Sequence, residues 1–131
     1  MDFFKEGKKL TYSEVVEVLK SLIKQDILSY LEPNELNNLF IRLLNFTKET
    51  LSRCLTSQEY VMRDSRELWT RAMKHKIIAN EPVWKKALKL QEEIEKEEGE
   101  SIDKTSLVEF ISGDLCQAMQ RLVQHPQIKR L

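Results

Sequence analysis

Residues that break or turn a backbone are scarce in this chain. Among 131 residues there are three glycines and three prolines. Their positions are Gly7, Gly99, Gly113, Pro33, Pro82 and Pro126. Because glycine and proline are the usual means of interrupting regular structure, long stretches between them can remain helical. The sequence therefore predicts an all-α fold, a compact single-domain bundle of about six amphipathic helices.

Apolar residues recur at helical spacing in several segments. We expect helices over residues 11–30, 34–44, 50–55, 56–79, 80–98 and 103–125. Asn34 is expected to cap the second of these, and either Asp103 or Ser106 the last. Pro82 suits the first turn of the fifth, where its missing N–H is not needed. Gly113 falls in mid-helix, which predicts either a close approach by a neighbouring element or a local bend.

The length of the chain bounds its organisation and its location. We expect one helical domain over 1–131, with 1–10 and 125–131 less ordered. No run approaches the ~20 apolar residues that span a bilayer, and the first residues lack a signal peptide's apolar region. Cys54 and Cys116 stand within apolar helical patterns, so they are predicted to be buried free thiols. Together these features predict an intracellular protein of the cytoplasm or nucleus that does not bind membranes.

Charge is balanced overall but unevenly distributed. Lysine plus arginine equals aspartate plus glutamate, at 21 each. Residues 63–89 contain eight basic and three acidic residues, and residues 90–114 contain two basic and nine acidic ones. Ordinary solvated helix surfaces would explain this pattern. The alternative is a polar recognition surface for another protein or for RNA.

Catalytic and metal-binding patterns are lacking. His75 and His125 lie in different segments, and neither has a cysteine, histidine or carboxylate at metal-ligand spacing. There is no glycine-rich phosphate loop, no nucleophile elbow and no zinc-protease motif. We therefore predict no catalytic residue, no metal site and no cofactor, and we expect a protein that is not an enzyme.

Two tryptophans offer the most specific candidates for a site. Trp69 and Trp84 each stand in the apolar stripe of a predicted helix, which suits core residues. If the two helices pack antiparallel, both rings could instead border a groove for a peptide or partner helix. The predicted partner-binding residues are Trp69, Trp84, Arg66, Arg71 and Lys85.

Part of the chain resembles an F-box. The stretch from Ile27 to Leu36 contains Ile-Leu-Ser-Tyr-Leu followed by Glu-Pro-Asn-Glu-Leu, and residues 64–69 read Asp-Ser-Arg-Glu-Leu-Trp. With the segment 44–54 between them, this order is similar to the F-box-like region of the Elongin A family, over Leu10 to Met73. The resemblance implies a non-enzymatic adaptor that docks through its first helices on a ubiquitin ligase or on the transcription machinery.

A second resemblance leads to a different class of function. The chain is similar to the helical C-terminal domain of filovirus transcription activators at Leu10-Thr11, 27–31 and 103–107. This likeness implies an RNA- or nucleocapsid-associated domain, which would use the basic surface 63–89 and would bind less tightly as salt rises. A homodimeric helical regulator, with an apolar groove filled by a second copy, is the third hypothesis.

Overall fold

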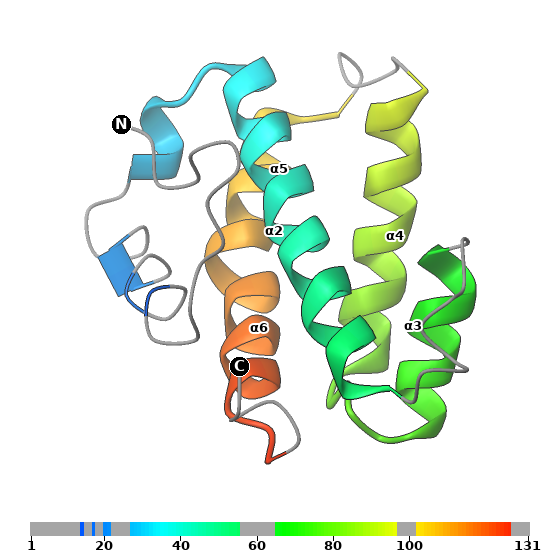
Figure 1. Ribbon diagram of the computed structural model, residues 1–131. Helices are drawn as coiled ribbons and strands as arrows, with labels where there is room; N and C mark the ends of the chain where they lie inside the picture. Colours follow the sequence, from blue (N-terminus) through cyan, green and yellow to red (C-terminus); the bar gives the residue numbers. More distant parts are fainter. Residues whose placement is uncertain are drawn as a thin grey trace.

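A computed structural model describes residues 14, 17, 20, 21, 27–55, 65–96 and 102–126 of the chain. This part contains helices and turns and no strand (Figure 1), which confirms the predicted all-α class. The elements are η1 Ile27–Tyr30, α2 Pro33–Cys54, α3 Ser65–Lys74, α4 Glu81–Glu95, α5 Lys104–Phe110, the π-helical turn η3 Ile111–Leu115 and α6 Cys116–Val123. The chain ends that the sequence predicts to be less ordered, 1–10 and 125–131, lie outside the described residues, with the exception of residues 125 and 126.

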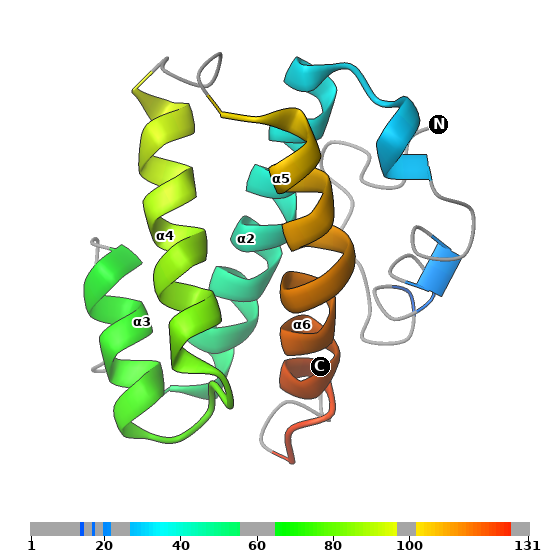
Figure 2. The same cartoon turned by 180° about the vertical axis from the view of Figure 1, so that it is seen from behind.

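Helix α2 lies at the centre of the arrangement. It contacts α3, α4 and α5. Helices α3 and α4 form an antiparallel hairpin, in which α4 also contacts η3 and α3 lies on the side away from α5 and α6, as both views show (Figures 1 and 2). The buried side chains of α2, α3, α4 and the continuous segment α5–η3–α6 form one core between these helices. Within it Phe40 of α2 contacts Phe110 of α5 edge to face, with ring centroids 6.2 Å apart. No helix within the described ranges is both long and apolar enough to cross a membrane.

The predicted number of helices is wrong. The predicted segments 34–44 and 50–55 form one helix, α2. Because α5, η3 and α6 follow one another without a break, they count as one long helix, and the described residues contain four such long helices. In α2 the polar residues between the two predicted segments do not interrupt the helix. The buried Thr47 donates its hydroxyl to the carbonyl of Leu43 at 2.9 Å, and Thr50 does the same to Phe46 at 2.9 Å. Hydroxyls satisfied in this way can lie on the buried face of a helix.

Helix α2 begins earlier than its predicted cap. The N-cap is Glu32, whose backbone N–H donates to the side chain of Glu35 at 3.1 Å, and Pro33 occupies the first turn. Asn34 lies inside that turn and accepts from the N–H of Glu35 at 3.0 Å, so its prediction as the cap was wrong. Proline at the first helical position is favoured because its fixed φ already suits the helix. Of the two predicted caps of the last helix, Asp103 and Ser106, Asp103 is the N-cap of α5. The predicted helix start at Asn80 is confirmed, since this residue is the N-cap of α4.

Helix α3 ends earlier than predicted. It stops at Lys74 rather than near Ala79, and its earlier part, 56–64, lies outside the described residues. Lys76 adopts a left-handed conformation with φ 58°. Its N–H bonds to the carbonyl of Met73 at 3.0 Å, and the N–H of the buried Ile77 bonds to that of Ala72 at 3.0 Å. This pair of bonds is the Schellman motif, which ends helices by turning the chain back over the last turn.

The predicted first helix, 11–30, is described only in part. Residues 14, 17, 20 and 21 are helical, and the remainder before Ile27 lies outside the described residues. The segment ends as the short 3₁₀-helix η1 rather than as a continuous α-helix. Ile27 and Leu28 are buried, and Lys104 of α5 donates to the carbonyl of Ser29 at 3.1 Å. These contacts attach η1 to α5.

The irregular turn at Gly113 is a π turn. The N–H of Cys116 bonds to the carbonyl of Ile111, five residues back. Buried residues spaced by four run along this long helix: Leu107, Ile111, Leu115, Met119 and Val123. Because a regular helix repeats every ~3.6 residues, such a stripe would rotate away from the core, and one wider turn brings it back. A Cβ added at Gly113 would meet no atom within 4 Å, so close approach of another element is excluded.

Candidate functional site

The two tryptophans of the predicted site lie in the core. Trp69 of α3 and Trp84 of α4 are each 1% exposed, and their rings stack with centroids 4.8 Å apart and an interplanar angle of 23°. This burial agrees with the alternative that both tryptophans are core residues. A contact of either ring with a partner stays a prediction, and it would require the α3–α4 hairpin to open.

Ion pairs on the surface of the hairpin engage two of the other predicted site residues. Arg66 near the start of α3 pairs with Glu92 near the end of α4, so this ion pair crosses between the two antiparallel helices. Lys85 pairs with Glu81 one turn earlier in α4, at 2.7 Å. Both basic side chains are 66% exposed, so each ion pair contributes little to stability. The structure therefore places Arg66, Arg71 and Lys85 on the surface.

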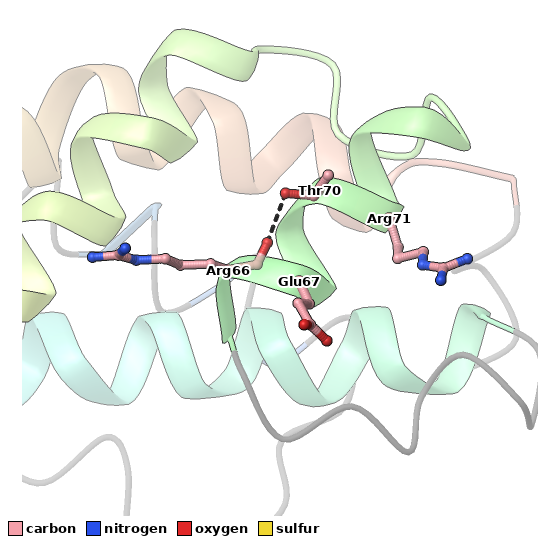
Figure 3. A pocket seen from close by; sticks show the side chains of 4 residues that line it. All are labelled: Arg66, Glu67, Thr70 and Arg71. Carbon is pink, nitrogen blue, oxygen red and sulfur yellow. Dashed lines mark hydrogen bonds between the residues drawn. The ribbon is translucent and has the colours of Figure 1, made fainter.

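A shallow pocket of about 320 Å³ lies along α3. Its lining residues are Arg66, Glu67, Thr70 and Arg71. Thr70 donates its hydroxyl to the carbonyl of Arg66 at 2.8 Å. The side chains of Arg66 and Arg71 extend in opposite directions along the helix, and Glu67 points away from both (Figure 3). The charged groups thus spread over the surface instead of converging on one point.

The sequence prediction had two of these four lining residues. Arg66 and Arg71 were predicted and both line the pocket, although their charged groups lie apart, whereas Lys85 is not part of its lining. Glu67 and Thr70 were missed, although each is separated by four residues from Arg71 and Arg66 respectively. Residues at that spacing share a helix face, which is the signal that could have identified them. Arg63 of the predicted basic surface lies outside the described residues.

A group of exposed positive charges occupies the end of the same helix and the turn that follows it. Arg71, Lys74 and Lys76 are exposed, and we call them the basic patch. The sequence contains no acidic residue between Glu67 and Glu81. Glu81 is already paired with Lys85. Across the described ranges no ion pair involves any of the three residues of the patch.

The two cysteines lack the environment of reactive thiols. Burial raises the pKa of the Cys116 thiol to about 11, and partial burial raises that of Cys54 as well. A thiol is a nucleophile only as the thiolate, so both residues are less reactive than an exposed cysteine. Within the described part of the chain no cluster of three metal-ligating side chains occurs.

A further cation lies beside the core on the other face of α4. The amino group of Lys86 is 4.8 Å from the centre of the Phe110 ring. At this distance the ring attracts the cation, which links α4 to α5 in addition to the apolar contacts. Lys86 thus lies against α5 and is not part of the pocket along α3.

The chain matches no known protein family, and no characterised protein and no solved structure is significantly similar to it. A function must therefore be inferred from the chemistry and geometry of its own residues.

Proposed function

We propose that this chain is a non-enzymatic protein-interaction module, an adaptor whose contact surface is the outer face of the α3–α4 hairpin. The contacting side chains are those of Arg66, Arg71 and Lys85, with Glu67 and Thr70 between the two arginines. The location that we propose for it is the cytoplasm or the nucleus.

The divergence of the pocket's side chains is the observation that carries this proposal. A small-molecule or catalytic site brings a few polar groups together on one ligand within a concave, mostly apolar cavity. Here the pocket is shallow, and Arg66 and Arg71 extend away from one another (Figure 3). An extended, charged helix face of this kind suits a macromolecular surface.

The rigidity of the hairpin supports the same proposal. The stacked pair of Trp69 and Trp84 holds α3 against α4 in the core beneath the pocket. A partner that binds a rigid surface loses less conformational entropy. Arginine is also enriched among the residues that dominate binding energy at protein interfaces.

The F-box-like stretch supplies a second candidate contact of the same adaptor. Tyr30 in η1 is 82% exposed, whereas Ile27 and Leu28 of the same short helix are buried. An exposed tyrosine offers a large apolar ring and a polar tip, which suits an interface. We propose a component of a ubiquitin ligase or of the transcription machinery as the partner of this segment.

The test is an affinity capture from cell lysate with the purified chain, with and without nuclease and at low and moderate salt. We expect a defined protein to be recovered in the presence of nuclease. Arg71→Glu should abolish its recovery. Arg121→Glu is the matched control, because Arg121 is also an exposed arginine in the last turn of a helix, α6. Recovery that responds equally to both variants would contradict the assignment of the surface.

The same experiment addresses the competing functions. If the captured proteins are lost after nuclease treatment and at moderate salt, RNA binding by the basic surface 63–89 would replace the adaptor function. Tyr30→Ala distinguishes the two surfaces of the adaptor: loss of ubiquitin-ligase or elongation components in this variant alone would support the F-box-like contact. Sedimentation of the purified chain as a dimer would favour the homodimeric regulator instead.

A further inference from the structure

The basic patch is built on an unusual backbone position. Lys76 is the non-glycine residue with a positive φ in the described part of the chain, at 58°. This conformation brings the Cβ of an L-residue close to a carbonyl oxygen, so glycine is the residue usually found there. A lysine at this position costs stability that a glycine would not. Strained positions retained in a protein direct attention to function.

The side chain of Lys76 serves no evident purpose within the fold. It is exposed and forms no ion pair with the described residues. The turn itself is held by backbone bonds, Lys76 to Met73 and Ile77 to Ala72, both at 3.0 Å, and a glycine would form them equally well. The buried Ile77 attaches the next residue to the core. What the lysine adds is positive charge, next to Lys74 and Arg71.

The patch is also prearranged for binding. Arg71 and Lys74 are separated by three residues in α3, so they lie on one face of the helix, and Lys76 is placed beyond its end. Because the backbone of all three is held by helix or turn bonds, a ligand has to order only side chains.

We propose that the basic patch binds an acidic segment of the partner protein through a run of carboxylates. This inference rests on the proposed function and specifies the chemistry of the partner. Arginine and lysine donate charge-assisted hydrogen bonds to carboxylates, and Arg71 can do so with two parallel bonds. A carboxylate of the partner does not have to displace Glu81 from the patch, because Glu81 is paired with Lys85.

The extent of the patch favours an acidic peptide over nucleic acid. Nucleic-acid sites without base contacts follow the phosphate backbone with a long positive groove. The patch instead comprises three cations. Its nearest acidic residues in the sequence are Glu67 before it and Glu81 after it, and the chain as a whole has no net charge. A short cluster of cations between acidic residues fits a few neighbouring carboxylates.

The test measures the anisotropy of a fluorescein-labelled oligo-glutamate peptide titrated with the full chain, with an oligo-glutamine peptide as the negative probe. We expect Lys76→Gly to weaken binding about fivefold while raising the melting temperature. Lys76→Arg keeps the charge and should bind as the wild type does. Arg71→Glu should weaken binding at least about tenfold.

Arg121→Glu separates a local site from general electrostatic attraction, because it changes the net charge as Arg71→Glu does. We expect it to bind the peptide normally. Equal weakening by both variants, unchanged binding by Lys76→Gly, or tighter binding of a labelled oligouridylate than of the peptide would overturn the proposal. If Arg71→Glu abolishes partner recovery from lysate but the oligo-glutamate peptide does not bind, the proposed function stands and the acidic ligand is rejected.

Discussion

Trp69 and Trp84 stack face to face in the core, 4.8 Å between ring centroids and 23° from parallel, one ring from each helix of the α3–α4 hairpin. Fifteen positions separate them in the sequence, and the turn between the helices places them at the same level. The stack fixes the distance between the helices whose outer sides present Arg71 and Lys85. The core thereby determines where the surface charges lie.

Truncating one ring of this stack should destabilise the protein strongly. Trp84→Ala removes a fully buried ring and leaves a cavity against Trp69, so we expect the free energy of unfolding to fall by about 3–5 kcal/mol. Urea denaturation followed by circular dichroism measures it. Lys85→Ala, at the exposed neighbouring position, should change stability by less than about 1 kcal/mol. A small effect of Trp84→Ala would mean that the stack does not hold the hairpin together.

Replacing Lys76 with glycine should stabilise the protein. Glycine relieves the left-handed strain, and its greater freedom in the unfolded chain offsets part of that gain, so we expect about 0.5–1 kcal/mol. Lys89→Gly is the matched control, because the same replacement at an exposed interior position of α4 should destabilise by about 1 kcal/mol. Thermal unfolding of both variants checks the pair. Destabilisation by Lys76→Gly would contradict the left-handed turn.

Gly113→Ala should also be stabilising. The added Cβ would meet nothing within 4 Å, and alanine is favoured over glycine in a helix by about 1 kcal/mol. Chemical denaturation would measure the gain. A loss of stability would indicate that glycine is needed by the π turn itself. Ser112→Ala tests that turn separately, because it removes the hydroxyl that donates to the carbonyl of Val108 at 2.8 Å.

Burial of Cys116 predicts a loss of stability at high pH. Its pKa is raised from 9.0 to about 11, so between these values the folded state holds a proton that the unfolded state has released. The free energy of unfolding should therefore be independent of this group below pH 9 and should fall as pH rises from 9 to about 11. Cys116→Ala removes this contribution. Comparing the two proteins' urea midpoints across that range isolates it, and parallel curves would contradict the burial.

Local signals in the sequence determined the helical class and two of the helix starts. Gly and Pro are few, and the apolar spacing is helical. The side chain of Asp103 caps α5 by accepting from the N–H of Thr105, an interaction that depends only on neighbouring residues, and Pro82 suits the first turn of α4. Arg66 and Arg71 were also predicted as surface contacts. Their positions in the exposed arc of α3 follow from the same local periodicity.

Tertiary structure decided the features that depend on burial. Thr47 lies within α2 because its hydroxyl donates to the carbonyl of Leu43 in the preceding turn, while the apolar residues around it pack in the core. The sequence alone does not show whether a polar residue is accommodated in a helix in this way or ends it. Lys76 accepts a strained φ because the burial of Ile77 fixes the turn that follows it. The stacking of Trp69 on Trp84, and the opposite directions of Arg66 and Arg71, likewise depend on how α3 lies against α4. Spacing along a chain specifies which residues share a helix face, whereas the packing of helices specifies which face is buried.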